Sequence, residues 1–384
     1  MTLDATVTST EIANRPWDAV VVGAGPAGTL AAREIARRGK SVLLLDRSAF
    51  PRWKVCGCCL NGSALSTLAA VGLGDLPARL GAVPLSGVAI AAGGRTATVR
   101  LQSGVALSRE AFDAALIRDA IRNGVAFRPT TEARRVGETE IELATESERI
   151  RIQPTVLIAA DGLNGQLAAT TGERPSVAHG SRIGAGTVAD CGADSYEPGK
   201  IHMAVGRGGY VGLVRLEDGR LDVAAAFDSA FVRAAGGLGN AAVAILREAG
   251  FPEIASLADS SWKGTPPLTR SPGCIAGERW FAVGDAAGYV EPFTGEGMAW
   301  ALASGAAVAP LAVREWSPSL AAEWKATHRR IVQDRQSLCR IVSRVLRSPR
   351  LTAVAVRLLG IAPSLSQPVI ARLNRPSLLA EPVA

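Results

Sequence analysis

Apolar runs and a helix-like stretch alternate at the start of the chain. Residues 18–23 read Asp-Ala-Val-Val-Val-Gly, which is strand-like in length and in β-branched content. Residues 29–39 are rich in Ala, Leu, Ile and Arg and predict a helix, and a second apolar run over 41–45 ends in Asp46. This order of strand, helix and strand predicts a βαβ unit of an α/β fold.

The first strand leads directly into the sequence Gly23-Ala24-Gly25-Pro26-Ala27-Gly28. Gly23 permits a tight turn, Gly25 lets the backbone approach a pyrophosphate, and Gly28 lets the helix pack on the strand. The phosphates would lie at the helix N-terminus, where unpaired N–H groups point at them. Asp46 follows Gly28 by 18 residues, within reach of a ribose 2′-hydroxyl. The pattern favours NAD or FAD over a 2′-phosphorylated dinucleotide.

Two later segments favour FAD. Residues 155–162 form an apolar run that ends in Asp161-Gly162, and residues 279–288 form another that leads into Gly284-Asp285. A flavin needs its ribityl hydroxyls held by an acid, and Asp285 can supply one.

The segment after Asp285 predicts the flavin-ring contact. Pro292, Gly295 and Gly297 let the backbone lie close to a ring, and a long Ala-rich helix begins near Gly297 and Met298. The N–H groups and dipole of its N-terminus would face the ring atoms at which charge collects on reduction.

These three motifs, in this order, resemble the p-hydroxybenzoate hydroxylase superfamily of FAD-dependent oxidoreductases, which includes geranylgeranyl reductases and flavin halogenases. The resemblance covers residues 18 to about 310. It implies an α/β fold in which a Rossmann-like FAD-binding domain is interleaved with a smaller antiparallel β-sheet substrate domain, with a helical C-terminal tail. It also implies that NAD(P)H, the expected electron donor, has no Rossmann domain of its own. The sequence carries no second glycine fingerprint.

The expected domain boundaries follow from this resemblance and from the turn-rich strand patterns. The FAD-binding domain takes residues 1–81, 108–180 and 273–315, the substrate domain takes 82–107 and 181–272, and a basic helical region takes 316–384. Strands are expected over 181–190, 201–205, 210–216 and 221–227.

The resemblance also assigns cofactor contacts. Arg109, in the segment Leu107-Ser-Arg-Glu-Ala-Phe-Asp113, would balance pyrophosphate charge or hold the ribityl chain. The full set of expected cofactor-binding residues is Gly23, Gly25, Pro26, Ala27, Gly28, Asp46, Arg47, Arg52, Arg109, Asp161, Gly162, Gly284, Asp285, Pro292, Gly295, Gly297 and Met298.

The segment Phe50-Pro-Arg52-Trp-Lys54-Val-Cys56-Gly57 resembles geranylgeranyl reductases, in which the Cys lies near the isoalloxazine. Arg52 or Lys54 would neutralise a cofactor phosphate or an anionic substrate. Two family motifs are absent from the sequence: the Trp-x-Phe-Pro-Lys strand of those reductases, whose place residues 209–215 take, and the Trp-x-Trp-x-Ile-Pro motif of halogenases.

Three residues are candidates for catalysis: Cys56, His202 and Tyr210. Each also has a plain structural interpretation as a core side chain. Met203, Tyr210, Phe227 and Trp262 are candidate walls of a substrate pocket. The spacing of Cys56, Cys58 and Cys59 does not suit a tetrahedral metal site, and no metal is expected.

Composition adds three restrictions. Hydrophobic residues make up 48% and charged residues 20%, which excludes a disordered or fibrous chain. Residues 1–17 do not resemble a secretory signal, and the longest uncharged stretch, 297–313, is shorter than the ~20 residues of a spanning helix. The six cysteines do not resemble a secreted disulfide framework, so we expect a cytoplasmic protein.

The net charge of +7 belongs to the C-terminal region. From residue 314 to the end there are twelve Lys or Arg and four Asp or Glu. One interpretation is a set of surface helices decorated with arginine, and the other is peripheral membrane contact, which suits a lipid-like substrate. Nucleic-acid binding is not expected, because no aromatic residue follows Trp324. The oligomeric state stays open.

The sequence thus predicts an FAD-dependent oxidoreductase acting on a small hydrophobic molecule. A monooxygenase that uses NAD(P)H and O₂ on an aromatic or hydrophobic substrate is the first hypothesis. A C=C reductase of geranylgeranyl-reductase type is the alternative. A non-catalytic redox sensor acting through Cys56, Cys58 and Cys59 is a hypothesis of another class, and the glycine motif alone would also suit an NAD-dependent dehydrogenase.

Overall fold

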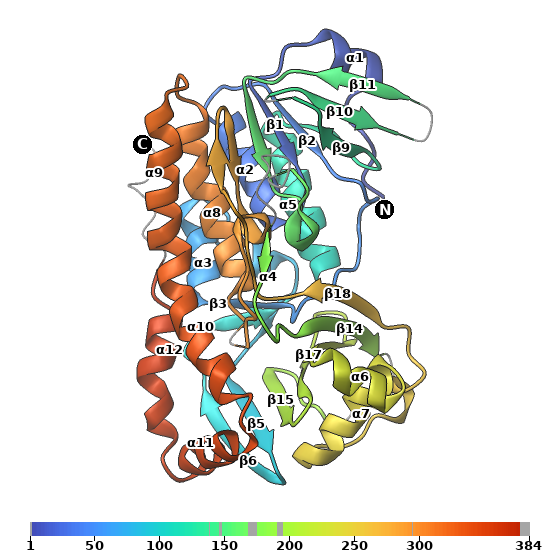
Figure 1. Cartoon of the computed structure of the whole chain (residues 1–384), viewed down its shortest axis with the longest axis vertical. Helices are drawn as coiled ribbons and strands as arrows, with labels where there is room; N and C mark the ends of the chain where they lie inside the picture. The colour runs from blue at the N-terminus through green and yellow to red at the C-terminus, as the bar shows by residue number, and fades with distance from the viewer. Residues whose placement is uncertain are drawn as a thin grey trace.

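Two β-sheets lie one above the other along the long axis of the molecule, and the C-terminal helices run along one side of both (Figure 1). The computed structural model describes residues 2–137, 139–145, 148–167, 175–189, 195–293 and 295–376. Of the expected strand 181–190, Asp190 lies outside the described residues.

The upper sheet is the expected Rossmann-like sheet. Its six strands, in spatial order, are β20 (Ala276–Gly277), β21 (Trp280–Ala282), β12 (Val156–Ala159), β1 (Ala19–Val22), β2 (Val42–Leu45) and β8 (Ala126–Arg128). All neighbours are parallel except β20 and β21. Chain order therefore reverses between β1 and β12, which is where such sheets bind nucleotides, outside the carboxyl ends of the strands.

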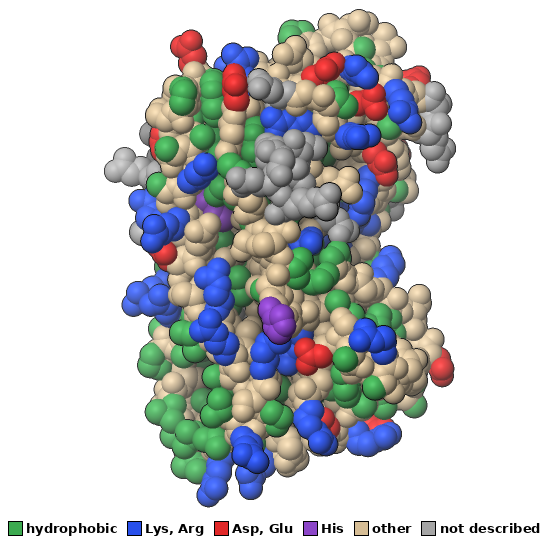
Figure 2. Space-filling view, in the orientation of Figure 1, with side chains coloured by type: hydrophobic (Ala, Val, Ile, Leu, Met, Phe, Trp, Pro, Cys, Tyr) green, Lys and Arg blue, Asp and Glu red, His purple; other side chains and the backbone are tan. Residues whose placement is uncertain are grey.

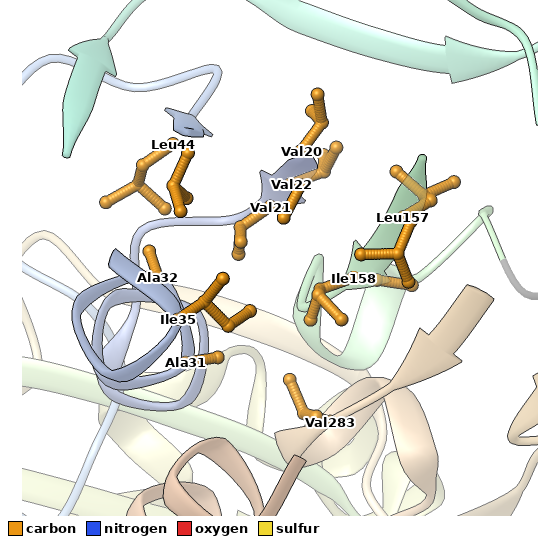
Figure 3. Close-up of a cluster of buried hydrophobic side chains, with 14 of the residues drawn as sticks. Val20, Val21, Val22, Ala31, Ala32, Ile35, Leu44, Leu157, Ile158 and Val283 are labelled. Atoms are coloured by element: carbon orange, nitrogen blue, oxygen red, sulfur yellow. The ribbon is translucent and has the colours of Figure 1, made fainter. Parts of the chain in front are cut away.

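Continuous burial explains the apolar composition of these strands. Val20, Val21, Leu44 and Ile158 are fully buried, and Figure 3 shows them between the helix that carries Ile35 and a layer of strands on the other face. The helices packed on one face are α2 (Pro26–Ala36), α5 (Arg109–Arg122) and α8 (Gly297–Ala312), and the strands on the other are β9 (Glu132–Arg135), β10 (Ile141–Ala144) and β11 (Arg149–Ile152).

The lower sheet has seven strands. They are, in spatial order, β18 (Lys263–Pro267), β14 (Ile183–Ala189), β17 (Leu221–Phe227), β16 (Gly209–Arg215), β15 (Lys200–Gly206), β5 (Gly87–Ala92) and β6 (Arg95–Arg100). The expected antiparallel sheet is thus present, with one difference from the prediction: β15 and β5, which no hairpin joins, pair in parallel.

Helices α6 (Ser229–Ala235) and α7 (Leu238–Ala249) accompany the lower sheet, and α7 packs its apolar face on β15 and β16. The C-terminal helices are α9 (Pro318–His328), the π-helical turn η5 (Arg329–Gln333), α10 (Asp334–Val345), α11 (Pro349–Ile361), η6 (Pro363–Ser366) and α12 (Gln367–Leu373). Helix α11 packs on β5 and β6, so the C-terminal region closes one side of the lower sheet.

The remaining helices and strands are short. They are α1 (Ser9–Asn14), β3 (Cys59–Asn61), α3 (Gly62–Ala70), α4 (Leu76–Arg79), β4 (Val83–Pro84), β7 (Gly104–Ala106), η1 (Gly162–Asn164), β13 (Ser176–Val177), η3 (Ala255–Leu257), β19 (Arg270–Ser271) and η4 (Gly284–Ala287). In the described ranges no single helix is long and apolar enough to cross a membrane, although two bent helix pairs, α6–α7 and α11–α12, meet the length and composition of a span.

Candidate functional site

The glycine loop after β1 has the close contacts that its sequence predicts. Gly23 has a φ of +109°, and a Cβ there would overlap the carbonyl oxygen of Ala160. A Cβ at Gly28 would overlap the carbonyl oxygen of Gly23. Gly23 therefore lets the loop lie against the residue after β12, and Gly28 lets α2, which begins at Pro26, pack against the loop.

Asp46 supports this loop from behind. It is buried at the end of β2, its Oδ2 accepts a hydrogen bond from the backbone N–H of Ala24 over 2.8 Å, and its Oδ1 accepts one from Ser48 over 2.9 Å. Arg52 lies 3.4 Å away. The acid thus fixes the loop to the second strand, and its contact with a ribose stays a prediction.

A cavity of about 920 Å³ begins at this loop. Most of the expected cofactor residues line it, although they come from loops far apart in the sequence: Gly25, Pro26, Ala27, Arg47, Arg52, Arg109, Asp161, Gly162, Gly284, Asp285, Pro292, Gly295, Gly297 and Met298. Gly23, Gly28 and Asp46 stand behind this lining. The structure therefore brings the three sequence motifs to one place.

Two cationic side chains, Lys54 and Arg109, face the carboxyl group of Asp285 in the upper part of the cavity. Burial and the nearby Arg109 lower the pKa of Lys54, while burial raises the pKa of Asp285 against the opposing effect of Lys54 and Arg109. Asp113 orients Arg109 through two hydrogen bonds, from Nε to Oδ1 over 2.8 Å and from Nη2 to Oδ2 over 2.7 Å. A bidentate pair of this kind holds a guanidinium in a fixed plane.

These residues fit FAD. Within the part of the chain that the structure describes, Arg52 Nε and Asp161 Oδ1 are buried without a hydrogen-bond partner. Phosphate oxygens and hydroxyl groups are the partners that such atoms need. The cavity is also at the upper end of the ~300–1,000 Å³ of small-molecule sites. Lys54 and Arg109 suit the pyrophosphate, and Asp285 suits the ribityl hydroxyls.

Three thiols line the middle of the cavity, as Cys56, Cys58 and Cys59. A hydrogen bond from the Cys58 thiol lowers the pKa of Cys56, and Arg109 lowers it further. That same bond, together with burial, raises the pKa of Cys58, and burial raises the pKa of Cys59. At neutral pH the arrangement favours one thiolate beside two protonated thiols.

The candidate catalytic residues separate into two groups. Cys56 and Tyr210 line the cavity, and the Tyr210 ring meets the Phe293 ring edge-on at 5.0 Å. His202 lies on the other face of β15, where its ring packs against Tyr196 at 5.0 Å and Phe251 at 5.9 Å. The side chains of Ile201 and Met203, one residue to either side, line the cavity instead. We therefore do not retain His202 as a catalytic candidate.

Two of the four expected pocket walls are also misplaced. Met203 and Tyr210 line the cavity, whereas Phe227 and Trp262 pack against each other at 6.4 Å in the cluster beneath α7. For Phe227 the reason is again the alternation of side chains along a strand, since its neighbour Ala226 lines the cavity, whereas Trp262 lies just before β18.

The C-terminal helices form the part of the cavity that sequence reasoning missed. Side chains of α10, α11 and α12 line its lower end, among them Val345, Leu346, Leu359 and Ile370. Apolar residues interleaved with arginines at helical spacing were the available signal. The sequence did not show what that apolar face packs against.

A family model and several known proteins match this chain. A family model described as an FAD binding domain matches residues 17–199. The chain is 29% identical over 317 residues to digeranylgeranylglycerophospholipid reductase 1 of Methanopyrus kandleri, covering 77% of this chain and 80% of that protein. Menaquinone reductase of Mycobacterium tuberculosis is 53% identical over 57 residues, 15% of this chain and 14% of that protein. An uncharacterized protein of Methanosarcina barkeri is 30% identical over 161 residues, 40% of this chain and 39% of that protein.

Solved structures share the fold. The flavin-dependent brominase Bmp2 superposes with a TM-score of 0.77 over 96% of this chain and 95% of its own, at 16% identity. The family match and the relatives support an enzyme of the FAD-dependent oxidoreductase superfamily.

Proposed function

We propose that this enzyme reduces C=C bonds in a long, apolar, isoprenoid-like molecule. The observation that carries the proposal is the shape of the cavity, which continues from the expected flavin site past the lower sheet to α10, α11 and α12. Its lower walls come from apolar side chains such as Val88, Ile90, Leu346 and Leu359. A site of this length and lining suits a flexible hydrocarbon chain better than one aromatic ring.

The similarity to a digeranylgeranylglycerophospholipid reductase over 80% of that protein supports the same substrate class. Geranylgeranyl groups are branched hydrocarbon chains with isolated double bonds. From the sequence alone a monooxygenase is the first hypothesis, and the long apolar cavity is the reason to reverse that order.

FAD, when bound, supplies hydride transfer. Lys54 and Arg109 hold its phosphates, Asp285 holds its ribityl chain, and the N-terminus of α8 stabilises negative charge beside the ring. Two protonated groups stand next to the loop expected to contact the ring. The Cβ of Cys59 lies 3.9 Å from the place that a Cβ at Gly295 would take. The Oη of Tyr289 lies 3.1 Å from the place that a Cβ at Gly297 would take. Burial raises both pKa values and so keeps both groups protonated, which is the state that a donor of the second hydrogen needs before the step.

A monooxygenase is the second candidate. Aromatic side chains of Tyr210, Tyr289 and Phe293 line the cavity close to the flavin-ring loop, and they would suit a flat substrate. NAD(P)H is the proposed electron donor for either reaction.

One experiment separates the two. The purified flavoprotein is reduced with dithionite under nitrogen and mixed with a geranylgeranyl lipid, and flavin absorbance and product mass are followed. Reoxidation of the flavin with a gain of two hydrogens in the lipid supports the reductase. No anaerobic reoxidation, together with insertion of one oxygen atom into an aromatic test substrate once O₂ is admitted, overturns it in favour of the monooxygenase.

A further inference from the structure

The C-terminal helices expose an unusual amount of apolar surface. Nine large hydrophobic residues are exposed in the described residues, and seven of them lie between positions 341 and 369. These seven, which we call the apolar patch, are Ile341, Leu351, Val354, Leu358, Ile361, Leu365 and Val369. Ile361 is 72% exposed. Figure 2 shows hydrophobic side chains gathered at the lower left, over α11 and α12. Exposed apolar residues in such a group mark an interaction surface.

The charge around the patch has one sign. Residues 335–376 contain eight arginines and no Asp or Glu. Arg340, Arg344, Arg350, Arg357 and Arg372 are all exposed, and Lys and Arg side chains border the hydrophobic ones in Figure 2. An apolar surface whose own segment, residues 335–376, carries arginine and no acid is complementary to a layer with a hydrocarbon interior and anionic head groups.

The geometry of the two helices suits insertion from one side. Helix α11 and the segment 363–373 meet at an angle of 118°, so the pair forms a bent hook rather than a span. Four residues of the apolar patch follow Val354 in this hook: Leu358 and Ile361 lie on α11, Leu365 on η6 and Val369 on α12. The other bent pair, α6–α7, differs, because α7 turns its apolar face into the core.

The apolar patch also surrounds the lower end of the cavity. Ile341, Leu358, Leu365 and Val369 are exposed and at the same time line the cavity. Residues with both properties mark where a cavity reaches the surface. One end of the cavity therefore opens within the patch.

We propose that the apolar patch docks on the surface of a bilayer that contains anionic lipids, and that the cavity opens into that bilayer. An amphiphilic molecule can then pass from the lipid into the cavity without crossing water. The docking step stands on the patch and its arginines, and only the identity of the entering molecule rests on the proposed function.

The test is co-sedimentation of the FAD-loaded protein with sucrose-filled vesicles of phosphatidylcholine, with or without phosphatidylglycerol. We expect binding to the anionic vesicles that weakens as salt is raised. Val354→Glu combined with Ile361→Glu changes two patch residues that do not line the cavity, and it should weaken vesicle binding by about tenfold or more. The matched control is Val136→Glu with Val177→Glu, which are the other two exposed hydrophobic residues and should bind like the unchanged protein.

A second pair of variants tests the charge. Arg350→Glu with Arg357→Glu should weaken binding to anionic vesicles, whereas Arg134→Glu, an exposed arginine of β9, should not. Bound FAD and the melting temperature are measured for every variant, so that loss of folding is recognised. The proposal is overturned if the unchanged protein does not bind vesicles, if patch and control variants lose binding equally, or if light scattering shows a dimer that the Val354→Glu, Ile361→Glu variant dissociates. A protein that binds vesicles but reduces no lipid would contradict the proposed function and leave the docking surface in place.

Discussion

Arg182 donates a hydrogen bond from Nη1 to Glu291 Oε1 over 3.2 Å, and both side chains are almost completely buried. Arg182 comes directly before β14 of the lower sheet, while Glu291 opens the loop that leads to the flavin-ring contact. Asp228 lies 3.5 Å from Arg182, and Arg347, in the turn between α10 and α11, lies 3.8 Å from the other oxygen of Glu291. One carboxylate thus connects the lower sheet, the ring loop and the C-terminal region.

Removal of that carboxylate should destabilise the protein strongly. Glu291→Leu leaves the Arg182 guanidinium buried beside only the half-exposed Asp228, and a broken buried pair costs about 3–5 kcal/mol of unfolding free energy. Urea denaturation measures the change. The control is Glu197→Leu, which breaks the shorter but exposed 2.6 Å pair with Lys200 and should change stability little. Equal effects of the two substitutions would contradict the role of burial.

Gly28→Ala should abolish or greatly weaken FAD binding. The added methyl group would overlap the Gly23 carbonyl oxygen and lie 2.8 Å from the Ala160 Cβ, so α2 must move away from the loop that receives the phosphates. We expect the dissociation constant for FAD to rise by about tenfold or more, measured by flavin fluorescence on titration. Gly360→Ala is the control, because a Cβ there would come no closer than 3.9 Å to Thr96. It should keep normal FAD affinity.

The sequence predicts those parts of the site whose geometry follows from the spacing of residues within one strand, turn and helix. Gly23, Gly28 and Asp46 need only a strand, a turn and a helix in succession, and each has the contacts that this order requires. Asp285 could be placed because the carboxyl ends of parallel strands meet at one edge of the sheet.

The sequence does not predict the parts of the site that depend on which face of a strand or helix is buried and on which other element covers that face. His202 differs from its neighbours Ile201 and Met203 by one step of strand alternation, and no local signal says which face meets the cavity. The apolar residues Val342 and Leu346, at the end of α10 and just after it, are visible in the sequence, but most of the residues that they pack with lie more than a hundred residues away.

Cys56 should react with iodoacetamide at a lower pH than a free thiol. The hydrogen bond from Cys58 and the nearby Arg109 lower its pKa, so the alkylation rate should reach its plateau below the ~8.5 of an ordinary cysteine. Peptide mass mapping assigns the labelled residue. Cys58→Ala removes the donor and should move the Cys56 profile to higher pH. Cys274→Ser changes a thiol outside the cavity lining and should leave the profile unchanged. A Cys56 profile centred on the free-thiol value would disprove the predicted thiolate.

His328 should make the protein less stable in mild acid. It lies at the end of α9, its ring is 1% exposed and packs 5.7 Å from the Trp324 ring, and neither ring nitrogen has a hydrogen-bond partner among the described residues. Burial lowers its pKa to about 4, whereas an unfolded chain has a histidine pKa of about 6.5. At pH values between these two pKa values, His328 is protonated in the unfolded state and unprotonated in the native state. Stability therefore falls as the pH drops below about 6.5, and His328 has no such effect above it.

The size of this effect can be measured by urea denaturation at about pH 7.5 and about pH 5. The lower pH lies about 1.5 units below the unfolded pKa, so His328 should account for about 2 kcal/mol of the lost stability. His328→Phe keeps a buried ring and removes the titration, and its loss between the two pH values should be smaller by that amount. His179→Phe changes an exposed histidine and should keep the full loss. If His328→Phe and the unchanged protein lost the same stability, the acid sensitivity would have to come from the carboxylates and not from this ring.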